Sequence, residues 1–166
     1  RESWVQIRTN KLSDDHASQL KAEIESTLST LYKVVSDEGL MRRALSQVTT
    51  QVQQQWHQDN EEVLAFLNWL SANHFLFMGF CEYDLTQDDE GAQQLAIHQD
   101  SCLGLFQLRP VYPYSSGFSN LEPHEKASWL SGPRLILSKS QQRATIHRNT
   151  HYDLIGIHKL NANGEV

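Results

Sequence analysis

The sequence predicts an α+β fold in which helices come first and an antiparallel sheet follows. Through the first 70 residues, apolar side chains recur every three or four positions, which is the period of an amphipathic helix. After residue 74 the pattern changes to short segments rich in aromatic and β-branched residues, several of them separated by turns of a few residues. Strands that are joined by such short turns run antiparallel to one another.

The first 58 residues are predicted to form one strand and two helices. Residues 4–7, WVQI, have the composition of a strand. Ser13 is a suitable N-cap for the first helix, because Asp14 and Asp15 follow it and face the positive end of the helix dipole. The apolar stripe of this helix is formed by Leu20, Ile24, Leu28, Leu31 and Val35. Gly39 is expected to end the helix. A second stripe follows at Met41, Leu45, Val48 and Val52.

The remaining residues are predicted to form one helix, then five strands with a short helix between the second and the third. This helix begins at Asp59 or Asn60 and buries Val63, Phe66, Leu67 and Leu70. The five strands are expected at residues 74–85, 94–99, 134–140, 144–148 and 153–160. Residues 102–108 continue or follow the second strand. A short helix at 121–130 lies in the connection between the second and the third strand.

This order of elements fits a five-stranded antiparallel sheet of the PAS-like type. An ACT-like βαββαβ unit is the alternative, but it requires a helix between the last two strands, and no helical pattern follows Ser140. We therefore expect residues 1–58 to lead in from a preceding module and residues 59–166 to form the PAS-like (or ACT-like) domain. Asn163-Gly164 predicts a hairpin turn with only two residues after it, which indicates a truncated hairpin and a piece of a longer polypeptide.

Composition argues against several classes of partner. The 166 residues include 14 Lys and Arg against 20 Asp and Glu, a formal net charge of -6, and the basic residues are scattered. We therefore expect no nucleic-acid partner. No apolar run approaches the roughly 18 residues of a membrane span, so no membrane partner is expected either. Cys81 and Cys102 are interpreted as reduced thiols, which is typical of a cytoplasmic protein.

No catalytic, cofactor-binding or metal-binding residue is predicted. The sequence contains no G-x-G-x-x-G, no Gly-Lys-Ser/Thr, no G-x-S-x-G and no C-x-x-C. His147 and His151 are four residues apart, but they flank a predicted turn, where that spacing defines no metal site. His74 is interpreted as closing the end of a helix rather than as a general base. Six apolar side chains are interpreted as core, with a sensory pocket as the alternative: Phe75, Phe77, Leu105, Phe106, Ile136 and Ile146.

One group of polar side chains lies on adjacent predicted hairpin turns. It consists of Arg143, His147, Arg148, Tyr152 and Asp153. Guanidinium groups beside other hydrogen-bond donors are suited to holding a carboxylate or another small anion. These residues are expected either to lie on solvated turns, which is the more common case, or to contact an anionic effector or a neighbouring domain.

Five stretches match, in the same order, the sequence pattern of one known family. Residues 66–85, FLNWLSANHFLFMGFCEYDL, correspond to its FLxWLxxxHFxFLGYxEYDL. Residues 134–148, RLILSKSQQRATIHR, correspond to LVLTKxxxRSTVHR, and residues 152–166, YDLIGIHKLNANGEV, to DYIGVKxFDxxGxV. Residues 4–14 and 101–108 match a strand-into-helix segment and a Gly-Leu-Gly segment. In these stretches the chain resembles the large, multidomain bacterial NAD-specific glutamate dehydrogenases.

The resemblance implies that the chain is part of the long N-terminal region of such an enzyme, which consists of ACT-like, PAS-like and helical modules. The parent enzyme oxidatively deaminates L-glutamate to 2-oxoglutarate and ammonia with NAD. Its catalytic residues and its NAD fold belong to a later region, so this chain is expected to be a non-catalytic regulatory or assembly module without a cofactor of its own. The implied partners are the neighbouring domains and subunits of a homo-oligomer, a tetramer by resemblance, and an amino-acid effector. A stand-alone PAS-type small-molecule sensor is the alternative.

Overall fold

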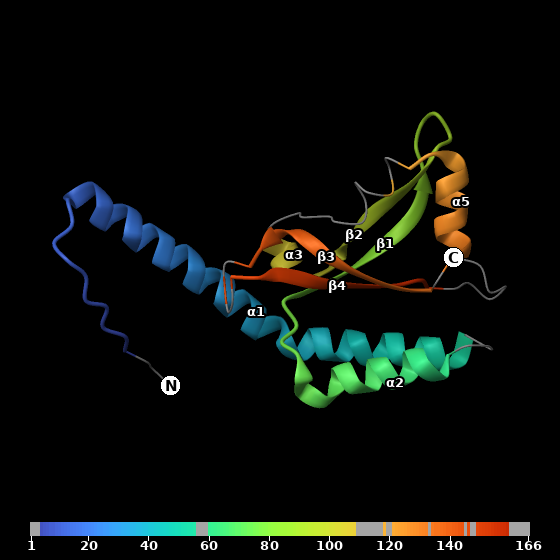
Figure 1. The fold of residues 1–166 in the computed structure, drawn as a ribbon, viewed down its shortest axis with the longest axis horizontal. Helices are drawn as coiled ribbons and strands as arrows, with labels where there is room; N and C mark the ends of the chain where they lie inside the picture. Colours follow the sequence, from blue (N-terminus) through green and yellow to red (C-terminus); the bar gives the residue numbers. More distant parts are fainter. Residues whose placement is uncertain are drawn as a thin grey trace.

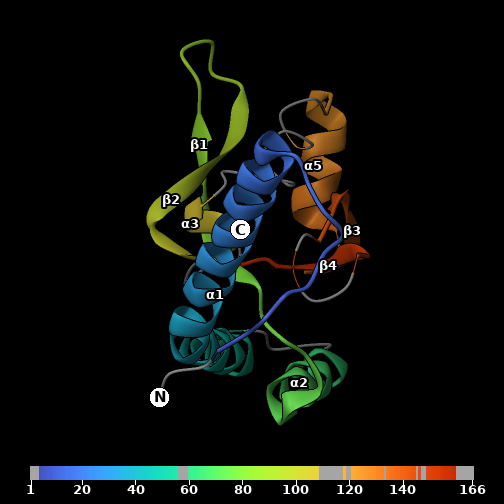
Figure 2. The same cartoon turned by 90° about the vertical axis from the view of Figure 1, so that its left-hand side faces the viewer.

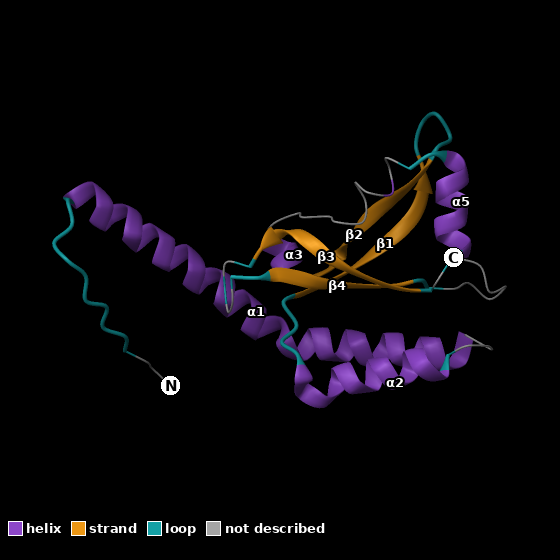
Figure 3. Ribbon diagram, viewed as in Figure 1, coloured by secondary structure: helices purple, strands orange, loops and turns teal. Residues whose placement is uncertain are grey.

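The computed structural model has an α+β architecture built from helices and two separate β-hairpins (Figures 1 and 3). It describes residues 4–55, 60–108, 118, 121–132, 134–144, 146 and 149–159. The N-terminal half of the first helix projects beyond the hairpins in Figure 1. Figure 2, which looks toward this projecting half, shows the two hairpins on different sides of the helix.

The predicted strand at residues 4–7 is wrong. These residues have no regular secondary structure and pair with no other described segment, and Trp4 and Val5 are 93% and 83% exposed. Since a strand is stabilised by pairing with a neighbour, its composition alone does not produce one. The N-cap of the following helix is confirmed, because the Ser13 hydroxyl accepts a 3.4 Å hydrogen bond from the His16 amide.

The first helix, α1, spans Asp14–Gln55 as one helix that bends near its middle (Figure 1), so the predicted end of a helix at Gly39 is wrong. A glycine inside a helix costs only about 1 kcal/mol relative to alanine, and packing on either side offsets that cost. Val34 and Met41, which flank Gly39, are 7% and 2% exposed. Burial on both sides therefore carries the helix through the glycine.

The predicted third helix is confirmed as α2 (Glu61–Trp69), which runs antiparallel to the C-terminal part of α1 (Figure 1). The two helices share a core cluster of buried side chains, namely Val52, Leu67 and Leu70. A π-helical turn, η1 (Leu70–His74), ends the pair. Within it Asn73 adopts the left-handed conformation with φ 64°, which asparagine tolerates better than most residues. The chain leaves this turn in an extended conformation toward the first hairpin.

The first hairpin is formed by β1 (Gly79–Gln87) and β2 (Gln93–Gly104), which pair antiparallel over nearly their whole length. A short helix, α3 (Leu105–Leu108), follows directly. Gly104 has φ 59°, and a Cβ atom there would lie 2.4 Å from the carbonyl oxygen of Met78. Only glycine fits at this close approach of two backbone segments.

The second hairpin is formed by β3 (Leu135–Arg143) and β4 (His151–Ile157), with the predicted short helix, α5 (Pro123–Ser131), before it. The strand predicted at 144–148 is wrong, since its described positions lie in the connection between β3 and β4. Ile146, within that connection, is 5% exposed and packs against α1. The apolar pattern there reflects burial of one anchoring side chain rather than strand pairing.

The second core cluster lies between α1 and the first hairpin. Its buried members are Val34, Met41 and Ile146, and the side chains packed around them are Phe77, Met78, Phe80, Leu103 and Leu105. Three of the six side chains predicted as core or pocket lie in this cluster, and they are Phe77, Leu105 and Ile146. Phe75, by contrast, is 39% exposed.

The predicted five-stranded PAS-like sheet is wrong. In the described part of the chain β1 pairs only with β2, and β3 pairs only with β4. The element order also differs from the ACT-like βαββαβ alternative. In that order a helix separates the first two strands and the last two strands, whereas here β1 is followed directly by β2, and no helix is described between β3 and β4. The sheet prediction counted apolar segments as strands, whereas pairing depends on contacts between residues far apart in the sequence.

Candidate functional site

The structure places three of the five predicted effector-contact residues on the second hairpin. Arg143, at the end of β3, lies opposite His151, and Tyr152 and Asp153 follow on β4. Arg143 is exposed to solvent. The other two predicted residues, His147 and Arg148, lie outside the described residues. An anion contact at this end of the hairpin therefore stays a prediction.

Cross-strand contacts already engage two of these residues. Asp153 lies opposite Lys139 and forms an ion pair with it, and both side chains are about two-thirds exposed, at 63% and 66%. An exposed pair of this kind contributes at most about 1 kcal/mol. The Tyr152 amide donates a 3.0 Å hydrogen bond to the Ser140 hydroxyl. Arg143 is thus the described member of the group whose side chain is most open to an anion.

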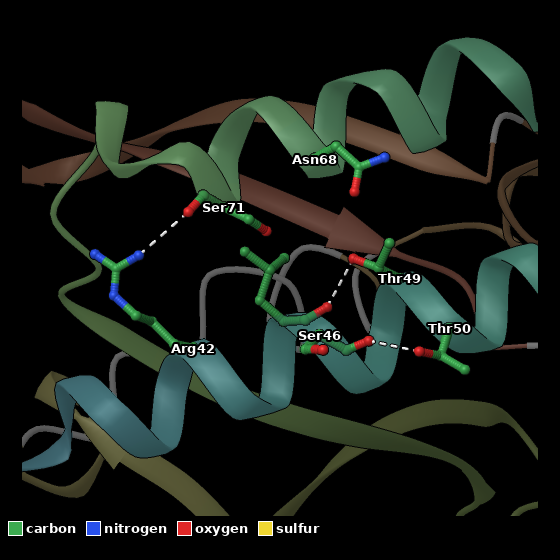
Figure 4. Close-up of a pocket in the computed structure, with 7 residues that line it drawn as sticks. Arg42, Ser46, Thr49, Thr50, Asn68 and Ser71 are labelled. Carbon is green, nitrogen blue, oxygen red and sulfur yellow. Dashed lines mark hydrogen bonds between the residues drawn. The ribbon is translucent and has the colours of Figure 1, made fainter.

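A groove between α1 and α2 is a second candidate, with a volume of about 290 Å³ (Figure 4). Six of the seven residues that line it have polar side chains, and the seven are Arg42, Leu45, Ser46, Thr49, Thr50, Asn68 and Ser71. Several hydroxyls donate to carbonyl groups of their own helix. Thr49 does so to Leu45 at 2.8 Å, and Thr50 to Ser46 at 3.0 Å.

The cation of the groove is also engaged. Arg42 forms an ion pair with Glu38 on the same helix, and its Nη1 donates a 3.4 Å hydrogen bond to the Ser71 carbonyl oxygen across the groove (Figure 4). Its guanidinium therefore joins α1 to η1, the turn that follows α2. The groove combines engaged polar groups with an open mouth, which is typical of a helix–helix seam rather than of a ligand site.

A buried carboxylate, which the sequence analysis missed, joins α1 to β2. Asp37 is 5% exposed, and its Oδ2 accepts a 2.9 Å hydrogen bond from the Gly104 amide and lies 3.1 Å from Lys33 Nζ. Burial by itself would raise the Asp37 pKa, but the hydrogen bond from Gly104 and the ammonium of Lys33 together hold that pKa below its ordinary value. Its helical spacing from Val34 and Met41, both on the buried face, was the signal that could have found it.

Neither cysteine suits a nucleophilic role. Burial raises the pKa of the Cys81 thiol to about 12, and burial also raises the pKa of Cys102. A reactive cysteine requires the opposite shift, because the thiolate is the nucleophile.

Among the residues that the structure describes, no group of three potential ligands lies close enough to hold a metal ion. No described helix is both long enough and apolar enough to cross a membrane.

Helix α5 contacts both hairpins. Lys126 is 8% exposed, and its ammonium donates a 2.8 Å hydrogen bond to the Gln93 carbonyl oxygen at the start of β2. The ring of Trp129 lies 4.6 Å, centroid to centroid, from the ring of His158, which directly follows β4, and the two rings are tilted by 55° to each other. His158 is 5% exposed, and neither of its ring nitrogens has a hydrogen-bond partner among the described residues. Burial, and secondarily the charge of Arg134, lower the pKa of His158.

Comparison with known proteins finds relatives in two bacteria. Over its whole length, in an alignment of 173 residues, the chain is 30% identical to a protein of Halomonas elongata named NAD-specific glutamate dehydrogenase. The chain belongs to the NAD-specific glutamate dehydrogenase family. A protein of the same name from Pseudomonas aeruginosa is 28% identical over 110 residues, which cover 64% of the chain.

The chain corresponds to only a small part of these glutamate dehydrogenases. It spans 11% of the length of the Halomonas relative and 6% of the length of the Pseudomonas relative. No protein-family model and no solved structure matches it. The resemblance inferred from the five sequence stretches is confirmed.

Proposed function

We propose that this chain is a non-catalytic segment in the N-terminal region of an NAD-dependent glutamate dehydrogenase. The parent enzyme converts L-glutamate, NAD and water to 2-oxoglutarate, ammonia and NADH. The observation that carries this proposal is the alignment of the whole chain with a relative of that name, of which it spans 11%. The fold agrees, since a dinucleotide-binding domain is built from parallel βαβ units with a Gly-rich loop. The described strands form antiparallel hairpins instead.

A regulatory or assembly role suits the chemistry of the described residues better than catalysis. The buried carboxylate of Asp37 is saturated by partners within the fold, and the thiols have raised pKa values. A segment of this kind acts by stabilising one arrangement of the catalytic domains over another. Its partners would be the other domains and subunits of a cytoplasmic homo-oligomer, a tetramer by resemblance. An amino-acid effector would contact Arg143 and its neighbours, and NAD would bind elsewhere in the enzyme.

The proposal predicts that the purified 166-residue chain neither binds NAD nor oxidises glutamate. NAD binding is measured by titration calorimetry, and turnover by the absorbance of NADH. The full-length enzyme, assayed in parallel, is the positive control. Turnover by the chain alone would overturn the proposal.

Titration of the same chain with L-glutamate or L-aspartate tests the effector contact. A binding heat that is unchanged in Arg143→Ala would argue against an effector contact at Arg143.

A further inference from the structure

The N-terminal half of α1 presents an apolar stripe that is exposed to solvent at three of its five members and partly exposed at Leu20 and Ile24. Its members are Leu20, Ile24, Leu28, Leu31 and Val35. Leu28 and Leu31 are 45% and 44% exposed, and Val35 is 63% exposed. At roughly 100° per residue, the five side chains fall within about 80° of one another around the helix axis. This half of the helix projects beyond both hairpins in Figure 1, so the stripe is sterically accessible to a partner.

The spacing of the stripe is nearly symmetric about Leu28. Leu20 and Val35 are equidistant in sequence from a point just before Leu28, and Ile24 and Leu31 are equidistant from the same point. An interface around a two-fold axis requires such symmetric spacing. If residue i of one copy contacts residue j of the second, then residue j of the first copy must contact residue i of the second. The stripe is therefore complementary to itself when a second α1 lies antiparallel to it.

The charges at the two ends of the stripe have the same symmetry. Asp14 lies 14 residues before Leu28, and Arg43 lies 15 residues after it. Helical geometry places both side chains along the same edge of the stripe. Within the described part of the chain, neither forms an ion pair. In an antiparallel pair the same edges of the two helices face each other, so Asp14 would lie close to Arg43 of the second copy.

We propose that α1 pairs with α1 of a second copy, antiparallel, around a two-fold axis next to Leu28. A second copy is favoured over an unrelated helix because both the apolar spacing and the end charges complement themselves. Antiparallel helices also place their dipoles in the favourable relative orientation. The stripe is about 22 Å long at 1.5 Å per residue. The proposal rests on the assembly role given above, but its test involves neither NAD nor turnover, so the two can fail separately.

Cysteine cross-linking of the full 166-residue chain tests the position of the axis. Only a two-fold pair centred there brings residue 28 next to residue 28 of the second copy. We expect Leu28→Cys to form a disulfide-linked dimer under mild oxidation, at least about tenfold more than the matched control Ser26→Cys. Ser26 is also exposed, but it lies on the opposite side of the helix. The unsubstituted chain sets the baseline, because both native thiols are poorly reactive.

A mixing experiment tests the direction of the pair. In the antiparallel arrangement residue 24 meets residue 31 of the second copy. Chains carrying Ile24→Cys and chains carrying Leu31→Cys should therefore cross-link when mixed, and each should cross-link only weakly alone. Strong dimers of Ile24→Cys alone would indicate a parallel pair and overturn the proposal.

Light scattering and circular dichroism complete the test. We expect the mass of the unsubstituted chain to rise from one copy to two with concentration, and Leu28→Glu to remain a monomer with unchanged helical signal. Leu28 is exposed within one copy, so its substitution leaves the packing of that copy intact. A folded chain that stays monomeric, and whose Leu28→Cys variant cross-links no better than Ser26→Cys, would show that another part of the enzyme covers the stripe and would overturn the proposal.

Discussion

The carboxylate of Asp37 joins two backbone segments that are 67 residues apart in the chain. It accepts a hydrogen bond from the Gly104 amide at the point where β2 ends and α3 begins, and it pairs with Lys33 one turn earlier on α1. Gly104 must be glycine because of its left-handed conformation and its contact with Met78. One acidic side chain and one glycine therefore add a specific polar contact to the apolar cluster that holds the first hairpin on α1.

Asp37→Ala should lower the free energy of unfolding by about 2 kcal/mol, because it leaves the buried Gly104 amide without its charged acceptor. Urea denaturation followed by circular dichroism measures this change. Asp153→Ala is the matched control, since it also removes an ion-paired carboxylate, but an exposed one, and should cost less than about 1 kcal/mol. Equal losses in the two variants would show that the Asp37 contact contributes nothing beyond a surface ion pair.

At the scale of the element, α1 explains why its two apolar stripes were taken for two helices. The stripe from Leu20 to Val35 and the buried residues from Val34 to Val52 lie on neighbouring faces of one continuous helix. The apolar face shifts around the axis near Gly39, so the periodicity is interrupted although the backbone is not. The helical period was predictable from the sequence, whereas the change of packing partner along the helix was not.

Gly39→Ala should therefore stabilise the chain by about 0.5–1 kcal/mol, because it removes the entropic cost of an exposed glycine inside a helix. A Cβ atom at this position would meet only Arg43 Nη1, at 3.9 Å. Thermal and urea unfolding measure the effect. Gly104→Ala, by contrast, should be strongly destabilising, and a loss of stability in both variants would contradict a continuous α1.

At the scale of the whole molecule, the sequence predicted the family, the α+β class and the positions of most helices and strands, but not how the strands associate. Local patterns indicate helices and hairpins because their contacts are close in sequence. The partner of each hairpin is decided by distant residues, as with Ile146, whose apolar segment is core without being strand. The contact between Asp37 and Gly104 was missed for the same reason, since neither residue is unusual until the other is placed beside it.

Helix α5 contacts both hairpins, and His158 should make the stability of its packing against β4 depend on pH. Because burial lowers the folded-state pKa of His158 below its ordinary 6.5, the unfolded chain takes up the proton first as the pH falls. The stabilising contribution of the neutral ring is therefore present above pH 6.5 and is lost as the pH falls toward the folded-state value.

We expect His158→Phe, which keeps an aromatic ring against Trp129, to reduce the loss of stability between about pH 7.5 and about pH 5.5. Urea midpoints at the two pH values measure it. His124→Phe, at an exposed position on α5, is the control and should leave the loss unchanged. An identical pH dependence in all three proteins would exclude His158 as the titrating group.

The division of the strands into two hairpins has a practical consequence for handling the chain. Each strand of a two-stranded sheet has one edge with no strand beside it in the described structure, and such edges hydrogen-bond readily to strands of other molecules. Lys139 and Asp153 place charges on the second hairpin, and charge is the usual protection of an exposed edge. The chain should therefore be most prone to aggregate in high salt, where these charges are screened, and most tractable in dilute buffer or within the larger enzyme.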